Sequence, residues 1–213
     1  MAELRISTFS APIPYVVGLE LQRSVEPDHL LLLEHEQVYT RGRRTKPEEL
    51  PMGEEWYRAQ GIDVCDTDRG GAVTYHGPGQ LVGYPIMRID KVHEYVSGLE
   101  RVIVAALADE GVEAEVREGL TGVWASKGKI GSIGVHVSRG VTSHGFAVNV
   151  DNDLQPFEWI VPCGMAGAHM SSICKETGEA GRMDSFREAV VRRFCEVFER
   201  ERAETHVVVS PVG

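Results

Sequence analysis

The chain has 213 residues, 42% of them hydrophobic, and a formal net charge of −10. This length can bury the core of one large domain, so we expect a single domain over residues 1–213. A general nucleic-acid binder needs a basic face and a membrane span needs about 18 consecutive apolar residues, so the sequence argues against a nucleic-acid or membrane partner.

The four cysteines, Cys65, Cys163, Cys174 and Cys195, are widely spaced and form no Cys-x-x-Cys pair. Reduced thiols of a cytosolic protein fit this spacing better than a disulfide framework or a zinc site does. The first residues contain neither a long apolar run nor an Arg- and Ser-rich stretch. We therefore predict no signal or transit peptide and a cytoplasmic location.

The hydrophobic spacing of the first half predicts short elements separated by turns. The continuous apolar run at 29–35 has strand length and no polar face, which is typical of a strand buried on both sides. Around it we expect, in chain order, a helix at 15–25 ended by Pro27, a basic loop at 39–47, a helix at 54–60 closed by Gly61, and a strand at 62–65.

The most distinctive stretch is 69–85, which contains five glycines and two prolines among strand-forming residues. It is predicted to form two short strands joined by a tight turn at 76–79. Glycine allows another chain or a ligand to approach the backbone closely. Gly70 and Gly71 behind Arg69 therefore predict a main-chain wall against a ligand, with one cation beside it.

The second half combines two amphipathic helices with a series of strands. The first helix runs from 93 to 110 and stops at Gly111. The last begins with a capping box, Ser185-x-x-Glu188, and turns Phe186, Val190, Phe194 and Val197 inward. Strands are expected at 112–116, 121–126, 129–137, 141–150 and 206–209, with the third and fourth paired across 138–140 and an irregular stretch at 151–172. Such runs of strands predict an α+β fold with a mixed or antiparallel sheet and flanking helices.

Three candidates for chemistry stand out, each with a structural alternative. Cys163 lies between Pro162 and Gly164, where an exposed thiolate could attack a carbonyl, although residues alone favour a buried loop cysteine. Lys129 opens a glycine-flanked strand and is either a desolvated base or a solvent-facing lysine. His76 and His144 each precede a glycine; without acidic partners they are more typical of structural residues than of metal ligands, so we predict no metal.

Four motifs together resemble one enzyme family, the octanoyl-[acyl carrier protein]:protein N-octanoyltransferases of lipoate biosynthesis. They occur in the family's order and close to its spacing over roughly residues 28–175. The motifs are Arg69-Gly70-Gly71-x-x-Thr74-Tyr75-His76-Gly77-Pro78-Gly79-Gln80-Leu81, Lys129-Ile130-x-Ser132-Ile133-Gly134, His144-Gly145-Phe146-Ala147-x-Asn149-Val150 and Pro162-Cys163-Gly164.

This resemblance implies a fold like the catalytic domain of biotin and lipoate protein ligases. It also implies that Cys163 is the nucleophile and Lys129 its paired base. The implied acyl-binding residues are Arg69, Gly70, Gly71, Ala72, Val73, Thr74, Tyr75, His76, Ser132, Ile133, Gly134, His144, Gly145 and Phe146. Gly131 stands where the family pattern leads us to expect alanine, which we expect to widen the pocket or loosen the strand.

The implied reaction moves an octanoyl or lipoyl group from acyl carrier protein through a cysteine thioester to a lysine, the first step of protein lipoylation. The implied acceptors are lipoyl domains of 2-oxoacid dehydrogenases and the glycine cleavage H protein. No cofactor is needed, because the donor thioester is already activated. Backbone N–H groups near Gly70 and Gly71, or beside Cys163, are candidates for holding the oxyanion.

Two other functions remain open at this stage. An ATP-dependent lipoate or biotin ligase would share the fold, but neither a Gly-Arg-Gly-Arg loop nor a triple glycine is present. A non-catalytic acyl- or metal-binding module would use Cys163 and the histidines only to bind. Because the whole chain is acidic, we also expect a local basic patch, Arg41, Arg43, Arg44 and Lys46, to dock an acidic carrier, with a solvated loop as the alternative.

Overall fold

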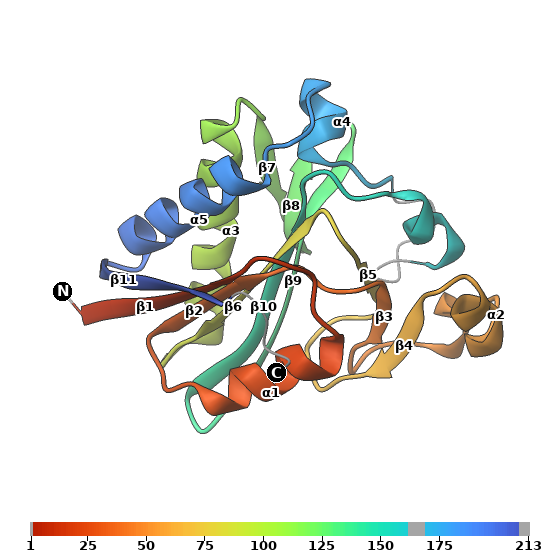
Figure 1. Ribbon diagram of the computed structural model, residues 1–213, viewed down its shortest axis with the longest axis horizontal. Helices are drawn as coiled ribbons and strands as arrows, with labels where there is room; N and C mark the ends of the chain where they lie inside the picture. The colour runs from red at the N-terminus through yellow and green to blue at the C-terminus, as the bar shows by residue number, and fades with distance from the viewer. Residues whose placement is uncertain (1, 162–168, 209–213) are drawn as a thin grey trace.

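The computed structural model describes residues 2–161 and 169–208 (Figure 1). Within this part an eight-stranded mixed sheet has the order β11-β1-β2-β6-β10-β9-β8-β7. Its strands are β1 (Ala2–Phe9), β2 (His29–Leu33), β6 (Gln80–Ile86), β7 (Ala114–Arg117), β8 (Leu120–Ala125), β9 (Gly128–Ser138), β10 (Val141–Asn149) and β11 (Arg200–Val208). β1 is parallel to both its neighbours, and the other pairs are antiparallel. The predicted α+β class with a mixed sheet is confirmed.

A second, three-stranded sheet lies beside the first (Figure 1). It consists of β3 (Val38–Arg41), β4 (Asp63–Asp66) and β5 (Thr74–His76), in the order β4-β3-β5. The helices are α1 (Tyr15–Ser24), α2 (Glu54–Ala59), α3 (Val92–Asp109), α4 (Ile173–Thr177) and α5 (Met183–Val197), with 3₁₀ turns η1 (Pro47–Glu49) and η2 (Gln155–Trp159). No helix in the described residues is both long enough and apolar enough to cross a membrane.

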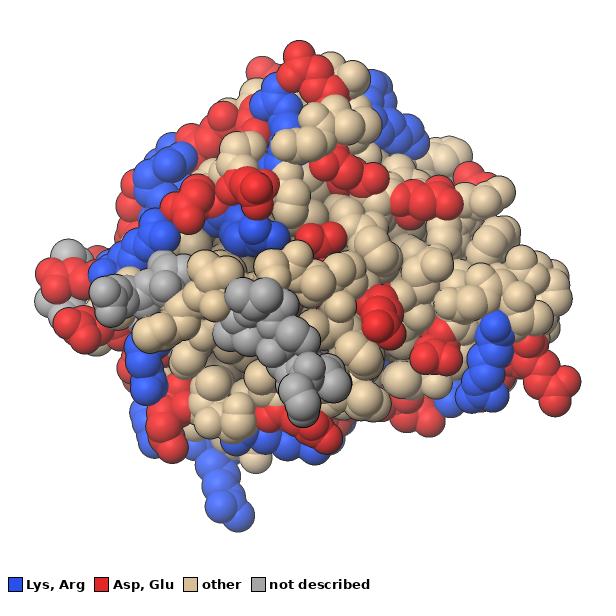
Figure 2. All heavy atoms as spheres, in the orientation of Figure 1, with Lys and Arg blue, Asp and Glu red and all other residues tan. Residues whose placement is uncertain are grey.

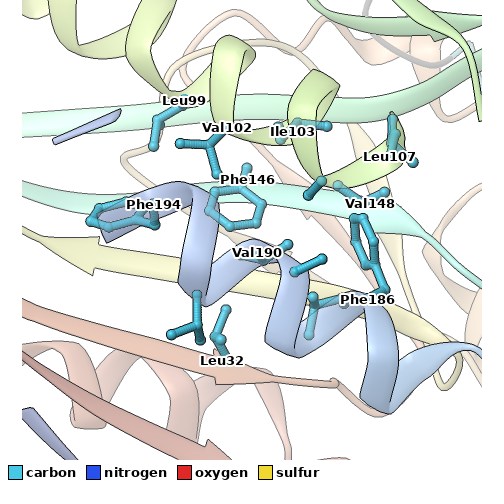
Figure 3. Packing of buried hydrophobic residues seen from close by; sticks show 14 of the residues in the cluster. Leu32, Leu99, Val102, Ile103, Leu107, Phe146, Val148, Phe186, Val190 and Phe194 are labelled. Carbon is cyan, nitrogen blue, oxygen red and sulfur yellow. The ribbon is translucent and has the colours of Figure 1, made fainter. Parts of the chain in front are cut away.

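The main core lies between the large sheet and the pair α3 and α5, as Figure 3 shows. The period of 3.6 residues brings the apolar side chains of each helix onto one stripe. Leu99 and Ile103 of α3 and Phe194 of α5 are fully buried there against Phe146 of β10. At about 1.5–3 kcal/mol for each large side chain, this packing is a main source of the fold's stability.

The opposite face of the large sheet is covered differently. Leu30 and Leu32 face α3 and α5, whereas Leu31 and Leu33 pack with Tyr84 beneath α1. The alternation confirms that the apolar run at 29–35 is a strand buried on both faces. The small sheet and α2 have their own aromatic core, in which the rings of Tyr39, Tyr57, Tyr75 and Phe157 are in contact.

Several predicted elements differ from the observed ones. The basic loop begins later than expected, because Tyr39, Thr40 and Arg41 are part of β3. The two strands of 69–85 and the turn between them are present as predicted, but the strands belong to different sheets: β5 pairs with β3, and β6 lies between β2 and β10. The last strand begins at Arg200 rather than at His206. In each case long-range pairing, which local sequence does not encode, extends or redirects the strand.

The predicted capping box of the last helix is wrong. α5 begins at Met183, with Arg182 at the N-cap position and no side-chain capping bond. Ser185 is therefore already inside the helix, where its hydroxyl donates to the Arg182 carbonyl oxygen at 3.1 Å. The helix starts one turn earlier than the motif predicts, but its inward face is as expected, since Phe186, Val190 and Phe194 are fully buried.

Charged side chains are spread over the surface. On the face drawn in Figure 2, acidic and basic groups are interspersed. Many of them form exposed ion pairs, such as those of Asp109 with Arg192 and Arg193 at 2.7 and 2.6 Å. Exposed pairs contribute only about 0–1 kcal/mol each, so they affect solubility more than the fold.

Candidate functional site

A cavity of about 410 Å³ opens on the sheet face away from α3 and α5. Its floor includes Val82 and Tyr84 of β6, Ala147 of β10 and Ser132 of β9. Because strand side chains alternate, the neighbouring Leu81 and Val148 point into the helix-covered core instead. The size is in the usual range for small-molecule sites, roughly 300–1,000 Å³.

Most of the residues that the sequence motifs single out line this cavity. They are Arg69, Gly71, Ala72, Thr74, His76, Lys129, Ser132, Ile133, Gly134, His144, Gly145 and Phe146. Three others do not: Val73 and Tyr75 belong to the core of the small sheet, and Gly70 lies against β9. Thr74 and His76 alternate with Val73 and Tyr75 along β5, so only one face of this strand can meet a ligand.

The glycine wall is held by a direct backbone contact. The Gly70 N–H donates to the Val135 carbonyl oxygen at 2.9 Å. A Cβ added to Gly134 would lie 2.8 Å from the Gly70 carbonyl oxygen, so glycine is needed for this close approach. Since its amide is already engaged, the Gly70 N–H is not available to an oxyanion, and the other backbone candidates stay predictions.

Arg69 has a structural part in the wall, although it also lines the cavity. It is 7% exposed, and its guanidinium donates to the Thr40 carbonyl oxygen at 2.6 Å and to the Thr40 hydroxyl at 2.8 and 3.1 Å. A further bond of 3.0 Å reaches the Gly70 carbonyl oxygen. The guanidinium therefore ties the glycine wall to β3.

Lys129 is buried in the cavity wall and is 3% exposed, so the solvent-facing alternative is excluded. Its Nζ donates to the Thr121 carbonyl oxygen at 3.2 Å and lies 5.1 Å from the centre of the Trp124 ring. A cation over an aromatic face is an attractive arrangement, more so where water is excluded. The peptide carbonyl and the ring together fix the position of the amine.

The backbone of Lys129 holds the chain that follows Cys163. The Lys129 N–H donates to the His169 carbonyl oxygen, and the Ser171 N–H donates to the Lys129 carbonyl oxygen, both at 2.9 Å. Upstream, the Val161 N–H donates to the Glu49 carbonyl oxygen at 3.0 Å. Cys163 itself lies outside the described residues, but the chain on both sides of it is anchored to residues of the cavity wall.

His76 has a tautomer fixed by its neighbours. The Gln80 side-chain N–H₂ donates to the Tyr75 carbonyl oxygen at 3.2 Å and to the Asn149 side-chain oxygen at 2.9 Å. The Gln80 oxygen must therefore accept the bond of 2.7 Å to His76 Nδ1, which carries the proton. Complete burial lowers the pKa of His76 well below its usual value, so Nε2 is a bare acceptor.

Tyr15 and Tyr84 form the far polar wall, with His35 buried behind them. Tyr84 donates its hydroxyl to His35 Nε2 at 2.6 Å, because His35 Nδ1 donates to the Ile13 carbonyl oxygen. Burial lowers the pKa of His35 to about 4 and raises that of Tyr15 to about 12. Both groups are therefore neutral in neutral solution.

His144 connects this wall to the surface. Its Nε2 lies 2.7 Å from Asp68 Oδ1 and its Nδ1 lies 3.5 Å from the Tyr15 hydroxyl. Burial lowers the pKa of His144, with the Asp68 carboxylate acting in the opposite direction. The motifs did not assign Tyr15, Tyr84, Asp68 or Thr121, although Asp68 directly precedes Arg69 and Tyr84 lies in the distinctive stretch.

Two further expectations concern Gly131 and metal binding. Gly131 does not widen the cavity, because a Cβ added there would meet Ile103 of α3 at 3.3 Å, on the other face of the sheet. Within residues 2–161 and 169–208, no three His, Cys, Asp or Glu side chains gather in a metal-binding arrangement.

Comparison with known proteins identifies the family. Residues 17–195 match the model of the lipoyl protein ligase A/B catalytic domain. The chain belongs to this family. The sequence is 42% identical to an octanoyltransferase of Mycobacterium sp. (strain KMS), over 93% of this chain and 87% of that protein. It is 44% identical to an octanoyltransferase of Solibacter usitatus (strain Ellin6076), over 89% of this chain and 90% of that protein.

A solved structure supports the fold of this lipoyl protein ligase A/B family member. The bipartite lipoate protein ligase of Thermoplasma acidophilum, studied with its E2 lipoyl domain, matches with a TM-score of 0.80 over 99% of this chain and 89% of that one. At 18% identity this likeness shows the fold alone. Because the relatives of much higher identity are octanoyltransferases, the chain is an acyltransferase that transfers an octanoyl group in protein lipoylation.

Proposed function

We propose that this acyltransferase takes the octanoyl group from acyl carrier protein onto Cys163 and passes it to a lysine of lipoyl domains, in 2-oxoacid dehydrogenases and the glycine cleavage H protein. One observation carries the proposal: the buried amine of Lys129 lines the cavity, and the Lys129 backbone binds residues 169 and 171, just beyond Cys163. We treat residues 1–213 as one catalytic domain. The pairing of β1 with β11 in a single sheet supports this.

In the first half-reaction Lys129 takes the proton of the Cys163 thiol. The thiolate attacks the carbonyl carbon of the donor thioester, a C–S bond to Cys163 forms, and the C–S bond to the carrier breaks. The carrier leaves as a thiol with the proton from Lys129. Proton transfer requires the amine to come within about 3 Å of the sulfur in the reacting complex.

In the second half-reaction the acceptor lysine amine attacks the acyl-Cys163 carbonyl carbon. A C–N bond forms, the C–S bond breaks, and Lys129 carries the amine proton to the departing sulfur. Both halves begin from a thioester, so neither consumes ATP. The apolar side chains of the floor, among them Val82 and Ala147, favour an alkyl chain at about 0.8 kcal/mol for each buried methylene.

The predicted docking patch becomes smaller in the structure. Arg41 is engaged by Glu54 at 2.6 Å and by Asp66 at 2.7 Å, so it is not available to a carrier. Arg44 and Lys46 are exposed and also line the cavity. We assign donor docking to these two cations, with Arg43 beside them.

The docking assignment is tested by the double variant Arg44→Glu/Lys46→Glu. We expect the KM for the octanoyl carrier to rise at low salt while the rate with a small octanoyl thioester is unchanged. A charge at the edge of the binding surface affects the association of the carrier with the enzyme rather than the chemical step. Lys91→Glu, an exposed lysine outside the cavity lining, is the matched control. An unchanged KM for the carrier would remove Arg44 and Lys46 from the docking surface.

The covalent intermediate is tested by intact-mass measurement after incubation with octanoyl carrier protein. We expect a mass gain of one octanoyl group in the unmodified enzyme and in Cys174→Ala, whose thiol is half-buried in α4. We expect none in Cys163→Ala. A persistent gain in Cys163→Ala would overturn the assignment of the nucleophile.

A further inference from the structure

One peptide group in β8 links two buried side chains of opposite charge. The Gly122 N–H donates to Glu100 Oε1 at 3.1 Å, and the Thr121 carbonyl oxygen accepts from Lys129 Nζ at 3.2 Å. These are the two ends of a single peptide unit. Glu100 of α3 is 8% exposed and Lys129 is 3% exposed, so water screens neither charge effectively.

The sheet leaves this peptide to the side chains. β8 pairs with β9 through Val123, Trp124 and Ala125, and neither of its ladders includes Thr121 or Gly122. Gly122 is buried, and a buried peptide N–H without a partner is costly, so this N–H needs a side-chain partner. Glu100 reaches the N–H from the helix-covered face, and Lys129 reaches the C=O from the cavity face.

Glycine at position 122 makes this crossing of the sheet possible. Its φ of +131° is a conformation that side chains rarely adopt, and it turns the peptide out of the regular ladder. A Cβ at position 122 would lie 2.7 Å from Lys129 Cε and 3.2 Å from Nζ. The missing side chain therefore also leaves the space that the lysine occupies.

We propose that Glu100 is a positioning residue for Lys129 and acts through the Thr121–Gly122 peptide. The carboxylate polarises the peptide, which makes the Thr121 carbonyl oxygen a stronger acceptor for the charged amine. The ammonium that forms when Lys129 takes the Cys163 proton is thereby stabilised at one place, over Trp124. This inference rests on the proposed function, in which that amine exchanges protons with Cys163.

Other charged groups near Lys129 are accounted for. Arg44, Lys46, Glu49 and Arg69 line the same cavity, as do the imidazoles of His76 and His144. Arg117 lies 5.5 Å from the centre of the Trp124 ring. The Glu49 carboxylate accepts from the Val73 N–H at 3.1 Å, in the glycine wall. Glu100 is thus the carboxylate joined to the amine through a shared peptide.

The test is the rate of self-acylation by a small octanoyl thioester, followed by intact mass. Glu100→Gln keeps an oxygen for the Gly122 N–H but removes the charge. We expect the rate at neutral pH to fall roughly tenfold, the effect of one charged hydrogen bond.

A double-variant cycle separates positioning from general damage. In the Lys129→Ala background, Glu100→Gln should have no further effect on the residual rate, because Glu100 acts on the Cys163 thiol only through the Lys129 amine. An equal loss in both backgrounds would overturn the inference. Equal activity of Lys129→Ala and the unmodified enzyme would instead overturn the proposed function.

A measurement on the folded protein covers the case in which Glu100→Gln does not fold. The Gly122 amide proton should change its NMR chemical shift on Lys129→Ala, since the amine acts on the other end of the same peptide. Gly119, in the turn before β8, provides a reference amide three residues away. A Gly122 resonance that stays in place while others near the cavity move would contradict the peptide link.

Discussion

The two faces of the large sheet use the same strands for different purposes. The face under α3 and α5 is filled by interlocking apolar side chains such as Phe146, Val190 and Phe194. The cavity face uses glycine backbone, imidazoles and phenols, each held by a specific hydrogen bond. Loss of side-chain volume on the first face should lower the stability of the fold, whereas displacement of a group on the second face should lower activity. Substitutions on each should therefore fail in different assays.

The largest effect is expected for Lys129→Ala on the cavity face. Loss of a positioned proton carrier should lower octanoyl transfer by 100-fold or more, since such groups contribute about 10²–10⁴-fold. Single-turnover transfer and thermal unfolding, measured on the same sample, check this. Near-normal transfer in a folded variant would exclude the assigned role.

Phe194→Ala tests the helix-covered face. The ring is fully buried and lies 4.5 Å from that of Phe198, so its removal should cost about 3–5 kcal/mol of unfolding free energy. Urea unfolding measures this loss. Activity per folded molecule should be unchanged. A loss of activity without a loss of unfolding free energy would contradict the assignment of stability to one face of the sheet and activity to the other.

The histidines of the cavity face predict sensitivity to acid. The folded protein binds a proton at His35 only near pH 4, whereas the unfolded chain binds one near 6.5. Between these values the unfolded state holds more protons, so stability falls as the pH is lowered, by about 3 kcal/mol from this group.

The variant His35→Gln should remove this part of the acid sensitivity. Gln can replace both bonds, accepting from Tyr84 and donating to the Ile13 carbonyl oxygen. Between pH 6.5 and 5, it should lose about 2 kcal/mol less stability than the unmodified protein. Burial also lowers the pKa of His76 and His144, so some dependence remains. Equal slopes would show that His35 is protonated in the fold.

The smallest effect is expected for Gly134→Ala. The added Cβ would press on the Gly70 carbonyl oxygen, so the glycine wall must shift and transfer should fall roughly tenfold. Gly53→Ala is the control, because nothing lies within 4 Å of its Cβ. Its φ of +81° adds a backbone strain that Gly134→Ala does not have. Normal transfer in Gly134→Ala would mean that the wall is adjustable.

Sequence patterns predicted the helix-covered face better than the cavity. The apolar stripe of α3 is a local signal, because its residues recur at helical spacing whatever the rest of the chain does. The cavity wall instead joins Tyr15, Asp68 and His144, which are far apart in sequence. No periodicity marks such a meeting, so only the motif residues of that wall were found in advance.

Competing local signals explain the remaining errors. Ser185 and Glu188 have the spacing of a capping box, yet α5 extends to Met183 because the first turn continues the buried face of the helix. The predicted turn at 76–79 is present, but a turn does not show which strands its two arms pair with. The turn sends the chain from one sheet to the other, which only the pairing of β5 with β3 reveals.

The parallel pairing of β1 with β11 joins Ala2 to Arg200. A ribosome that adds about 5–20 residues per second needs roughly 10–40 s to make the chain between them. During that time one edge of β1 lacks its final neighbour, and open strand edges invite association between chains. Protection of the nascent chain by a chaperone is therefore expected to matter more for the yield of this enzyme than for its activity once it is complete.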